Sequence, residues 1–165
     1  MNLIVVVDRN WAIGRGGDQL VYLSADLKRF QALTMGHTVI LGRKTLKTFP
    51  GGRPLPGRTN LILSRTPGLR VEGAQVCSSL EEVLARAGED AFVIGGESVY
   101  RALLPWCGTA YVTKVEADYP ADCWFPDLDA APDWRVAEEE GPLSQGEVSF
   151  RYVTYRRARG GTGGD

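Results

Sequence analysis

The residues Phe92-Val93-Ile94-Gly95-Gly96-Glu97-Ser98-Val99-Tyr100 decide the fold class, because an apolar strand here passes through two glycines directly into a helix. Glycine allows a backbone to approach a ligand closely, and the first turn of a helix offers free N–H groups to an anion. A Gly-Gly pair at such a turn also occurs for steric reasons alone. The stretch therefore predicts a strand–helix unit whose functional meaning depends on the segments around it.

The same alternation of short apolar runs and helical segments continues along the chain. We predict strands at residues 3–7, 37–41, 59–63, 91–94 and 110–116, and helices at 25–34, 79–87 and 98–106, with a short one ending near Phe49. Ser24 is the expected N-cap of the first helix, and Ser79-Leu80-Glu81-Glu82 forms a capping box for another. Residues 135–140 and 148–156 have the pattern of an antiparallel hairpin, whereas the glycine-rich stretch 9–22 is typical of a long mobile loop.

These elements predict a single α/β domain over residues 1–158, with a mostly parallel central sheet, an antiparallel C-terminal hairpin and flanking helices. The glycine-rich residues 159–165 have the composition of a flexible tail. A chain of 165 residues is large enough to bury roughly two-thirds of its unfolded surface.

The composition narrows the range of partners and compartments. A net charge of −1 gives no general attraction to nucleic acid or to an anionic membrane, and no apolar run is long enough to span a bilayer. Cys77, Cys107 and Cys123 are odd in number and lack the spacing of a metal site, so free thiols in a reducing cytoplasm are expected. We expect a small-molecule substrate, no metal and a monomer.

Polar and glycine residues follow four of the predicted strands, where ligands bind in open α/β sheets. The positions are the loop after Val7, Gly42 to Thr45, Ser64-Arg65, and Gly95 to Ser98. Arg43, Lys44, Ser64 and Arg65 are a suitable donor set for a phosphate monoester such as the 2′-phosphate of NADP. Any one of them alone is better explained as a solvated surface residue. The G-x-G-x-x-G fingerprint is absent, so an ordinary Rossmann site is not predicted.

Asp26 lies in the first turn of a predicted helix, at the border of the apolar face that contains Leu27 and Phe30. An aspartate at this position commonly stabilises the helix dipole, which is the simpler interpretation. At the edge of an apolar cleft, the same carboxyl would instead bind an amidine-like ligand and have its pKa raised by desolvation.

From residue 2 to about residue 158 the sequence resembles the dihydrofolate reductases. The resemblance is carried by the number, order and spacing of short motifs: residues 3–7, Ile13-Gly14, 23–30 around Asp26, 39–45, 52–58, Leu63-Ser64-Arg65, 94–100, Tyr111-Val112-Thr113, Asp122 and Phe125-Pro126. It implies an NADPH-dependent reduction of 7,8-dihydrofolate to tetrahydrofolate, with hydride transfer to pterin C6 and protonation at N5.

The resemblance also implies a role for individual residues. Asp26 matches the pocket carboxylate that binds the pterin and assists protonation, Thr113 matches the hydroxyl that braces it, and Arg58 matches the arginine that grips the substrate glutamate. The further substrate-binding residues are Ile4, Val5, Val6, Leu27, Phe30, Phe49, Arg53, Leu55, Ile94 and Tyr100. The cofactor-binding residues are Val6, Ile13, Gly14, Gln19, Gly42, Arg43, Lys44, Thr45, Leu63, Ser64, Arg65, Ile94, Gly95, Gly96, Glu97, Ser98, Val99 and Tyr100. Gly95-Gly96 matches a pair that the family joins by a cis peptide bond.

One segment departs from the family pattern. Val21 stands where the family has tryptophan, and Ser24 stands where it has a second proline, so we expect weakened ligand binding. Two alternatives remain: a related NADPH-dependent pyrimidine reductase of riboflavin biosynthesis, and a pterin- or NADPH-binding protein without turnover. The first should lack the combination of Asp26, Phe30 and Arg58, and intact Asp26 and Thr113 argue against the second.

Overall fold

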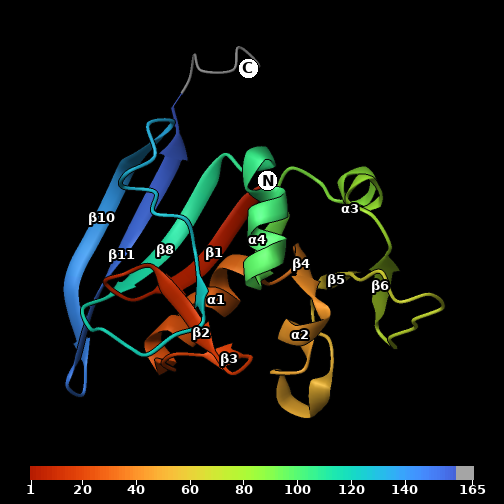
Figure 1. Cartoon of the computed structure of the whole chain (residues 1–165), viewed down its shortest axis with the longest axis horizontal. Helices are drawn as coiled ribbons and strands as arrows, with labels where there is room; N and C mark the ends of the chain where they lie inside the picture. The colour runs from red at the N-terminus through yellow and green to blue at the C-terminus, as the bar shows by residue number, and fades with distance from the viewer. Residues whose placement is uncertain (159–165) are drawn as a thin grey trace.

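The computed structural model describes residues 1–158, in which eight strands form one sheet in the order β10-β11-β8-β1-β7-β4-β5-β6 (Figure 1). All neighbouring pairs from β8 to β6 are parallel, whereas β11 is antiparallel to both β8 and β10. The predicted fold class, a mostly parallel sheet with an antiparallel C-terminal hairpin, is therefore confirmed. The predicted tail, residues 159–165, lies outside the described residues. The strands are β1 (Asn2–Val7), β4 (Thr38–Gly42), β5 (Thr59–Leu63), β6 (Ala74–Cys77), β7 (Phe92–Gly95), β8 (Thr109–Val115), β10 (Trp134–Gln145) and β11 (Val148–Arg157).

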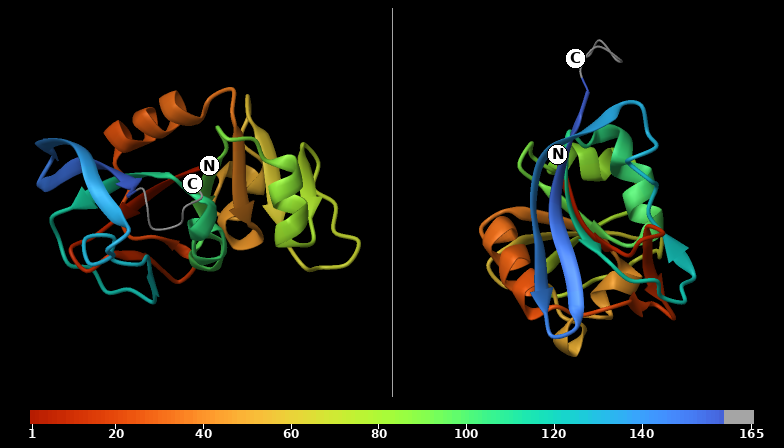
Figure 2. Two further views of the ribbon diagram at one scale, coloured as in Figure 1. Left: turned by 90° about the horizontal axis from the view of Figure 1, so that it is seen from above. Right: turned by 90° about the vertical axis from the view of Figure 1, so that its left-hand side faces the viewer.

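The central strands are apolar throughout because helices or loops cover both faces of the sheet. In β1, Leu3 and Val5 contribute to one buried cluster and Ile4 to another, as the alternation of side chains along a strand requires. Helix α1 (Ser24–Thr34) lies on one face of the sheet, and α3 (Leu80–Arg86) and α4 (Glu97–Leu103) lie on the other (Figure 2).

One short α-helix and two 3₁₀ helices complete the helical elements. Helix α2 (Arg43–Leu46) follows β4 directly and is followed by η1 (Pro50–Gly52), while η2 (Leu104–Trp106) extends α4. No helix in the described part of the chain is long and apolar enough to cross a membrane.

The two predicted helix caps have different outcomes. The Oγ of Ser79 accepts a hydrogen bond from the backbone N of Glu82 at 3.1 Å, so this N-cap is confirmed. The carboxylate of Glu82 reaches back to the N–H of Ser78 at 2.7 Å, one residue before the cap. The N-cap prediction for Ser24 is wrong, because the helix begins at Ser24 itself and Leu23 occupies the cap position without a side-chain hydrogen bond.

The stretch 9–22, predicted as a loop, contains a small hairpin. Strands β2 (Ala12–Arg15) and β3 (Asp18–Gln19) pair through a turn at Gly16 and Gly17, and β2 also pairs with β9 (Cys123–Trp124). Both turn glycines have positive φ, 63° and 84°, which suits a tight hairpin turn. The carboxylate of Asp122 accepts a hydrogen bond from the N–H of Gly16 at 2.9 Å and ties the hairpin tip to the segment before β9.

Candidate active site

The four strand ends that carry polar or glycine residues lie along one edge of the sheet. Strands β1, β7, β4 and β5 are consecutive neighbours, and the register pairs Leu41 with Gly95 and Gly42 with Leu63. The turns after Gly42, Leu63 and Gly95 are therefore adjacent, as the parallel arrangement predicted.

Asp26 and Thr113 meet although 87 residues separate them in the sequence. The Thr113 hydroxyl, which is buried on β8, donates a hydrogen bond of 2.5 Å to Oδ1 of Asp26 in the first turn of α1. Burial raises the pKa of the Asp26 carboxyl, while the hydrogen bond from Thr113 and the charge of Arg29 act to lower it. The site thus holds a carboxyl that takes up a proton more readily than an exposed aspartate does.

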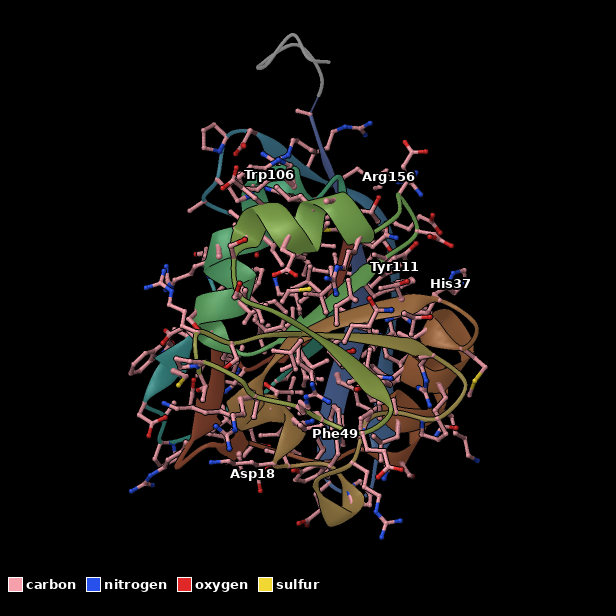
Figure 3. All side chains as sticks on the ribbon, turned by 90° about the vertical axis from the view of Figure 1, so that its right-hand side faces the viewer. Asp18, His37, Phe49, Trp106, Tyr111 and Arg156 are labelled. Carbon is pink, nitrogen blue, oxygen red and sulfur yellow. The ribbon has the colours of Figure 1, made fainter. Side chains whose placement is uncertain are left out.

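An apolar wall forms between α1 and the sheet beside this carboxyl. It comprises five of the residues that the resemblance assigned to the substrate, which share one cluster: Ile4, Phe30, Phe49, Leu55 and Ile94. Phe49 is labelled in Figure 3, at the end of the molecule that also carries Asp18.

Three further residues of that assignment lie outside this cluster. Val5 packs in the core cluster formed with Val93 and Tyr100, and Val6 is half-buried against the cluster around Leu23. Leu27 is 46% exposed on the surface of α1. None of these three side chains therefore belongs to the cluster that forms the wall.

Arg58 is held at the opposite end of α1 from Asp26. Its Nε donates to the carbonyl of Pro56 at 2.9 Å, and its Nη1 donates to Oγ1 of Thr34 at 3.2 Å. At 1.5 Å per residue, Asp26 and Thr34 are about 12 Å apart along the helix. A carboxyl and a guanidinium thus bracket one apolar wall, whereas Arg53 is exposed outside it.

The glycines at the sheet edge form a close-packed cradle. A Cβ added to Gly42 would lie 3.1 Å from Cγ2 of Val99, and one added to Gly95 would lie 3.3 Å from Oγ1 of Thr45. Gly95 has φ +130°, a conformation that side chains rarely adopt, and the Gly95-Gly96 peptide bond is cis. Only glycine leaves the backbone accessible here.

Tyr100 and Glu97 connect the turn from β7 into α4 to neighbouring segments by hydrogen bonds. The buried Tyr100 hydroxyl donates to the carbonyl of Ile4 at 2.7 Å, and its ring lies edge-on to Phe125 with centroids 5.1 Å apart. The carboxylate of Glu97 accepts a hydrogen bond from the N–H of Trp124 at 3.0 Å. Ser98 is exposed in the first turn of α4.

Basic side chains surround the cradle on its exposed side. Arg43, Lys44 and Arg65 are exposed, and within residues 1–158 none of them forms an ion pair. The hydroxyl of Ser64 accepts a hydrogen bond from the N–H of Thr66 at 3.2 Å, which orders the turn after β5. Their charges are thus available to an anionic ligand.

The β2–β3 hairpin faces the same region. A hollow lies between the tip of this hairpin and the chain at α2 and just after it. The hollow is lined by Gly16, Gly17, Asp18, Lys44, Lys47 and Thr48. Gly14 pairs with Gln19 in this hairpin, and Ile13 is half-buried against the core. The three hairpin residues that the resemblance assigned to the cofactor therefore lie on an element that borders the cradle.

A second hollow contains none of the predicted site residues. It lies beside β8 and the C-terminal hairpin, and its charged residues are mostly paired with one another: Lys114 with Asp129, and Arg151 with both Glu116 and Glu139. In the described part of the chain, no group of three or more His, Cys, Asp or Glu residues is placed to hold a metal ion.

Sequence reasoning missed three residues that position the site. Thr34 is buried and anchors Arg58, and buried Asn60 makes three hydrogen bonds to the backbone of Leu55 and Arg58. The carboxylate of Asp8, also buried, accepts hydrogen bonds from the N–H groups of Asn10, Ala12 and Tyr119. The sequence signal is weak, because Asp8 follows an apolar strand, Thr34 ends a helix and Asn60 lies near the start of a strand, and none of these positions reveals the partners.

A sheet edge with a glycine cradle, free cations and one half-buried carboxyl defines an α/β enzyme that binds a dinucleotide beside a second ligand. The family model described as dihydrofolate reductase matches residues 1–157. The dihydrofolate reductase of Mycobacterium leprae is 43% identical over 167 residues, covering 94% of this chain and all of that protein, and that of Bacillus subtilis is 34% identical over 161 residues, covering 95% and 94%. The solved structure of Enterococcus faecalis dihydrofolate reductase complexed with NADP(H) and RAB-propyl superposes with a TM-score of 0.84 at 33% identity, covering 94% of this chain and 95% of that one.

The chain therefore belongs to the dihydrofolate reductase family. Its activity is that of an NADPH-dependent oxidoreductase acting on dihydrofolate. The full-length match to dihydrofolate reductases confirms the predicted family and decides against a pyrimidine reductase of riboflavin biosynthesis.

Proposed function

We propose that the chain reduces 7,8-dihydrofolate to 5,6,7,8-tetrahydrofolate in the space bounded by Asp26, the apolar wall and the glycine cradle, with Asp26 and Thr113 as the catalytic pair. The single observation that carries this assignment is the 2.5 Å hydrogen bond between Thr113 and Asp26 at the edge of the wall. Within this proposal, Asp26 holds the 2-amino group and N3 of the pterin and favours protonation at N5. Its raised pKa supports the role, because a general acid works best when its pKa is near the operating pH.

The rest of the substrate extends along α1 in this proposal. Ile4, Phe30, Phe49, Leu55 and Ile94 would cover the pterin and benzoyl rings, and Arg58 would bind the glutamate carboxylate. A planar guanidinium can bind a carboxylate through two hydrogen bonds, and Arg58 is already oriented by Pro56 and Thr34. Arg53 would lie at the outer rim. Because the side chain of Val5 packs elsewhere, a contact from Val5 would have to use its backbone.

The residues at the sheet edge fit NADPH. The cradle at Gly42, Gly95 and Gly96 leaves backbone accessible to a diphosphate, and Arg43, Ser64 and Arg65 would face the 2′-phosphate. When bound, NADPH supplies the hydride that reduces the pterin at C6. The chain's own part is to place the two rings together and to keep water away, for which the β2–β3 hairpin with Ile13, Gly14 and Gln19 is suitably located.

A monomer in a reducing cytoplasm is the state that we propose for the working enzyme. Both edges of the sheet discourage pairing, because β10 carries the exposed Glu138 and Glu140 and β6 has only four residues. The three cysteines are free, with Cys77 and Cys107 buried. Light scattering on the purified protein tests the monomer directly, and a stable dimer would contradict it.

The test of the catalytic assignment is loss of NADPH absorbance on adding dihydrofolate, in the wild type and in Asp26→Asn. We expect kcat at neutral pH to fall by about 10²–10⁴-fold in the variant, the usual contribution of a general acid or base. NADPH binding should be retained, because Asp26 is not part of the cradle. Equal turnover in both proteins would leave the activity in place and remove Asp26 from the mechanism.

A further inference from the structure

Arg29 carries a half-buried guanidinium beside the proposed site. It lies three residues after Asp26 on α1, and its Cζ is 4.0 Å from the ring centroid of Tyr152 and 5.9 Å from that of Tyr111, which is labelled in Figure 3. Its Nη1 is buried and has no hydrogen-bond partner within residues 1–158. No carboxylate of that described range forms an ion pair with it.

This arrangement is costly for a residue with no other task. A buried guanidinium nitrogen without a hydrogen bond destabilises the folded state, and stacking on an aromatic face offsets only part of that. A residue of similar length without charge would fill the same space against Tyr152 at lower cost. The charge itself is therefore the feature that requires an explanation.

The carboxyl of Asp26 is the neighbouring group on which that charge acts. Residues three apart on a helix are neighbours on its surface, and the charge of Arg29 lowers the pKa of Asp26 against the effect of burial. From the other elements, Thr113 of β8 donates to Asp26, and Tyr111 of β8 and Tyr152 of β11 stack on Arg29.

The remaining charged and titratable neighbours do not replace Arg29. Burial raises the pKa of Tyr100 on α4, and the charge of Asp26 adds to this. Burial also raises the pKa of Tyr152 most, Asp26 and Glu140 of β10 raise it further, and Arg29 lowers it. Both tyrosines are therefore neutral at physiological pH. Lys28, the other cation on this part of α1, is exposed, where solvent screens its charge.

We propose that Arg29 is a positioning residue for the reduction, whose half-buried charge sets the pH at which the Asp26 carboxyl takes up and releases its proton. The inference rests on the proposed role of Asp26. It adds that the titration of the site is tuned by a side chain outside the predicted substrate- and cofactor-binding residues. The aromatic faces of Tyr152 and Tyr111 hold the guanidinium there without neutralising it.

The test is the pH profile of single-turnover NADPH oxidation with dihydrofolate, compared among the wild type, Arg29→Met, Arg29→Lys and the matched control Lys28→Met. Loss of an opposite charge raises the pKa of a carboxyl, so Arg29→Met should move the midpoint of the profile to higher pH by on the order of one unit. Arg29→Lys should restore the wild-type midpoint, and Lys28→Met should leave it unchanged. If Arg29→Met does not fold, Arg29→Gln takes its place.

A midpoint that is the same in Arg29→Met and Lys28→Met would overturn the inference. A midpoint in Arg29→Lys that is shifted as far as that of Arg29→Met would overturn it too. The same comparison in an Asp26→Asn background separates this proposal from the one it rests on. There we expect the wild-type midpoint to disappear and Arg29→Met to cause no shift. If Asp26→Asn keeps the wild-type midpoint, the proposed role of Asp26 fails and the inference fails with it. If Asp26→Asn abolishes the midpoint while Arg29→Met alone leaves it in place, only the inference fails.

Discussion

Burial disfavours the ionised form of the Asp26 carboxyl, so the free energy of unfolding depends on pH. Because burial raises its pKa in the folded state, the folded protein binds this proton more tightly than the unfolded chain does. Stability therefore falls as pH rises from the usual aspartate pKa through the raised value. We expect Asp26→Asn to have a higher Tm than the wild type at neutral pH, with the difference disappearing in acid. Thermal unfolding across pH measures it.

Asp129 is the matched control for that experiment because its shift has the opposite sign. Burial acts to raise the pKa of this carboxyl, but the hydrogen bonds from Lys114 and Tyr155 outweigh it and hold the pKa below the usual value. Asp129→Asn should therefore lower Tm at neutral pH, and its deficit should shrink as pH falls. Equal effects of the two substitutions would contradict the account of Asp26.

Val21 is the residue at which we expect the site to be weaker than in relatives that have tryptophan there. It is half-buried beside the cluster of Leu23, Val115, Phe150 and Tyr152. Val21→Trp should tighten dihydrofolate binding by about 1–3 kcal/mol through added contact. The adjacent Tyr22, 52% exposed and bonded to Asp18, gives the control Tyr22→Phe, which should change nothing. Unchanged affinity and rate in Val21→Trp would contradict the expectation that valine in place of tryptophan weakens ligand binding.

At the scale of elements, the turn from β7 into α4 depends on the absence of a side chain at Gly95. Gly95→Ala must adopt φ near +130° and place a methyl group 3.3 Å from Thr45. We expect a loss of about 1–3 kcal/mol in stability and at least about tenfold weaker NADPH binding. Gly68→Ala is the control, since Gly68 also has positive φ but nothing within 4 Å. NADPH affinity that falls equally in both variants would argue against a cradle at Gly95.

The loop between η1 and β5 depends on one buried amide. The Oδ1 of Asn60 accepts a hydrogen bond from the N–H of Leu55, and its Nδ2 donates to the carbonyls of Leu55 and Arg58. Asn60→Ala leaves these backbone groups without partners, so we expect a loss of about 2–3 kcal/mol in stability and a higher KM for dihydrofolate. Asn60→Asp keeps the acceptor oxygen, so its stability and its KM should lie between those of the wild type and of Asn60→Ala. A KM that stays at the wild-type value would show that Arg58 is held without this loop or does not bind substrate.

The elements with a strong hydrophobic pattern could be predicted from the sequence, and those with a weak pattern could not. The continuous apolar runs of β1, β4, β5, β7 and β8 were predicted within one or two residues, because both faces of these strands are buried. Strand β6 was missed because Ala74-Gln75-Val76-Cys77 is a short edge segment without distinct alternation. Strand β10 runs past its predicted end, through the cis Gly141-Pro142 bond and a register shift, where composition indicated a break.

At the scale of the whole molecule, the proposed site exists only when distant segments meet. The order β1-β7-β4-β5 brings the glycine and arginine turns to one edge, and α1 crosses the same region with Asp26 at one end and Thr34 at the other (Figures 1 and 2). The sequence motifs predicted this edge and, through the family resemblance, the pairing of Asp26 with Thr113. They could not predict Arg29, Thr34 or Asn60, since the importance of each comes from partners chosen by tertiary packing.

In the proposed complex, one edge of the sheet holds pterin and dinucleotide together against Asp26. The most direct measurement is a crystal structure of the full chain with NADP⁺ and folate bound. We predict the pterin 2-amino group at hydrogen-bond distance from Asp26, about 2.7–3.2 Å, and the diphosphate between the turns after Gly42 and Gly95. A pterin bound away from Asp26, or a diphosphate outside those turns, would contradict the account.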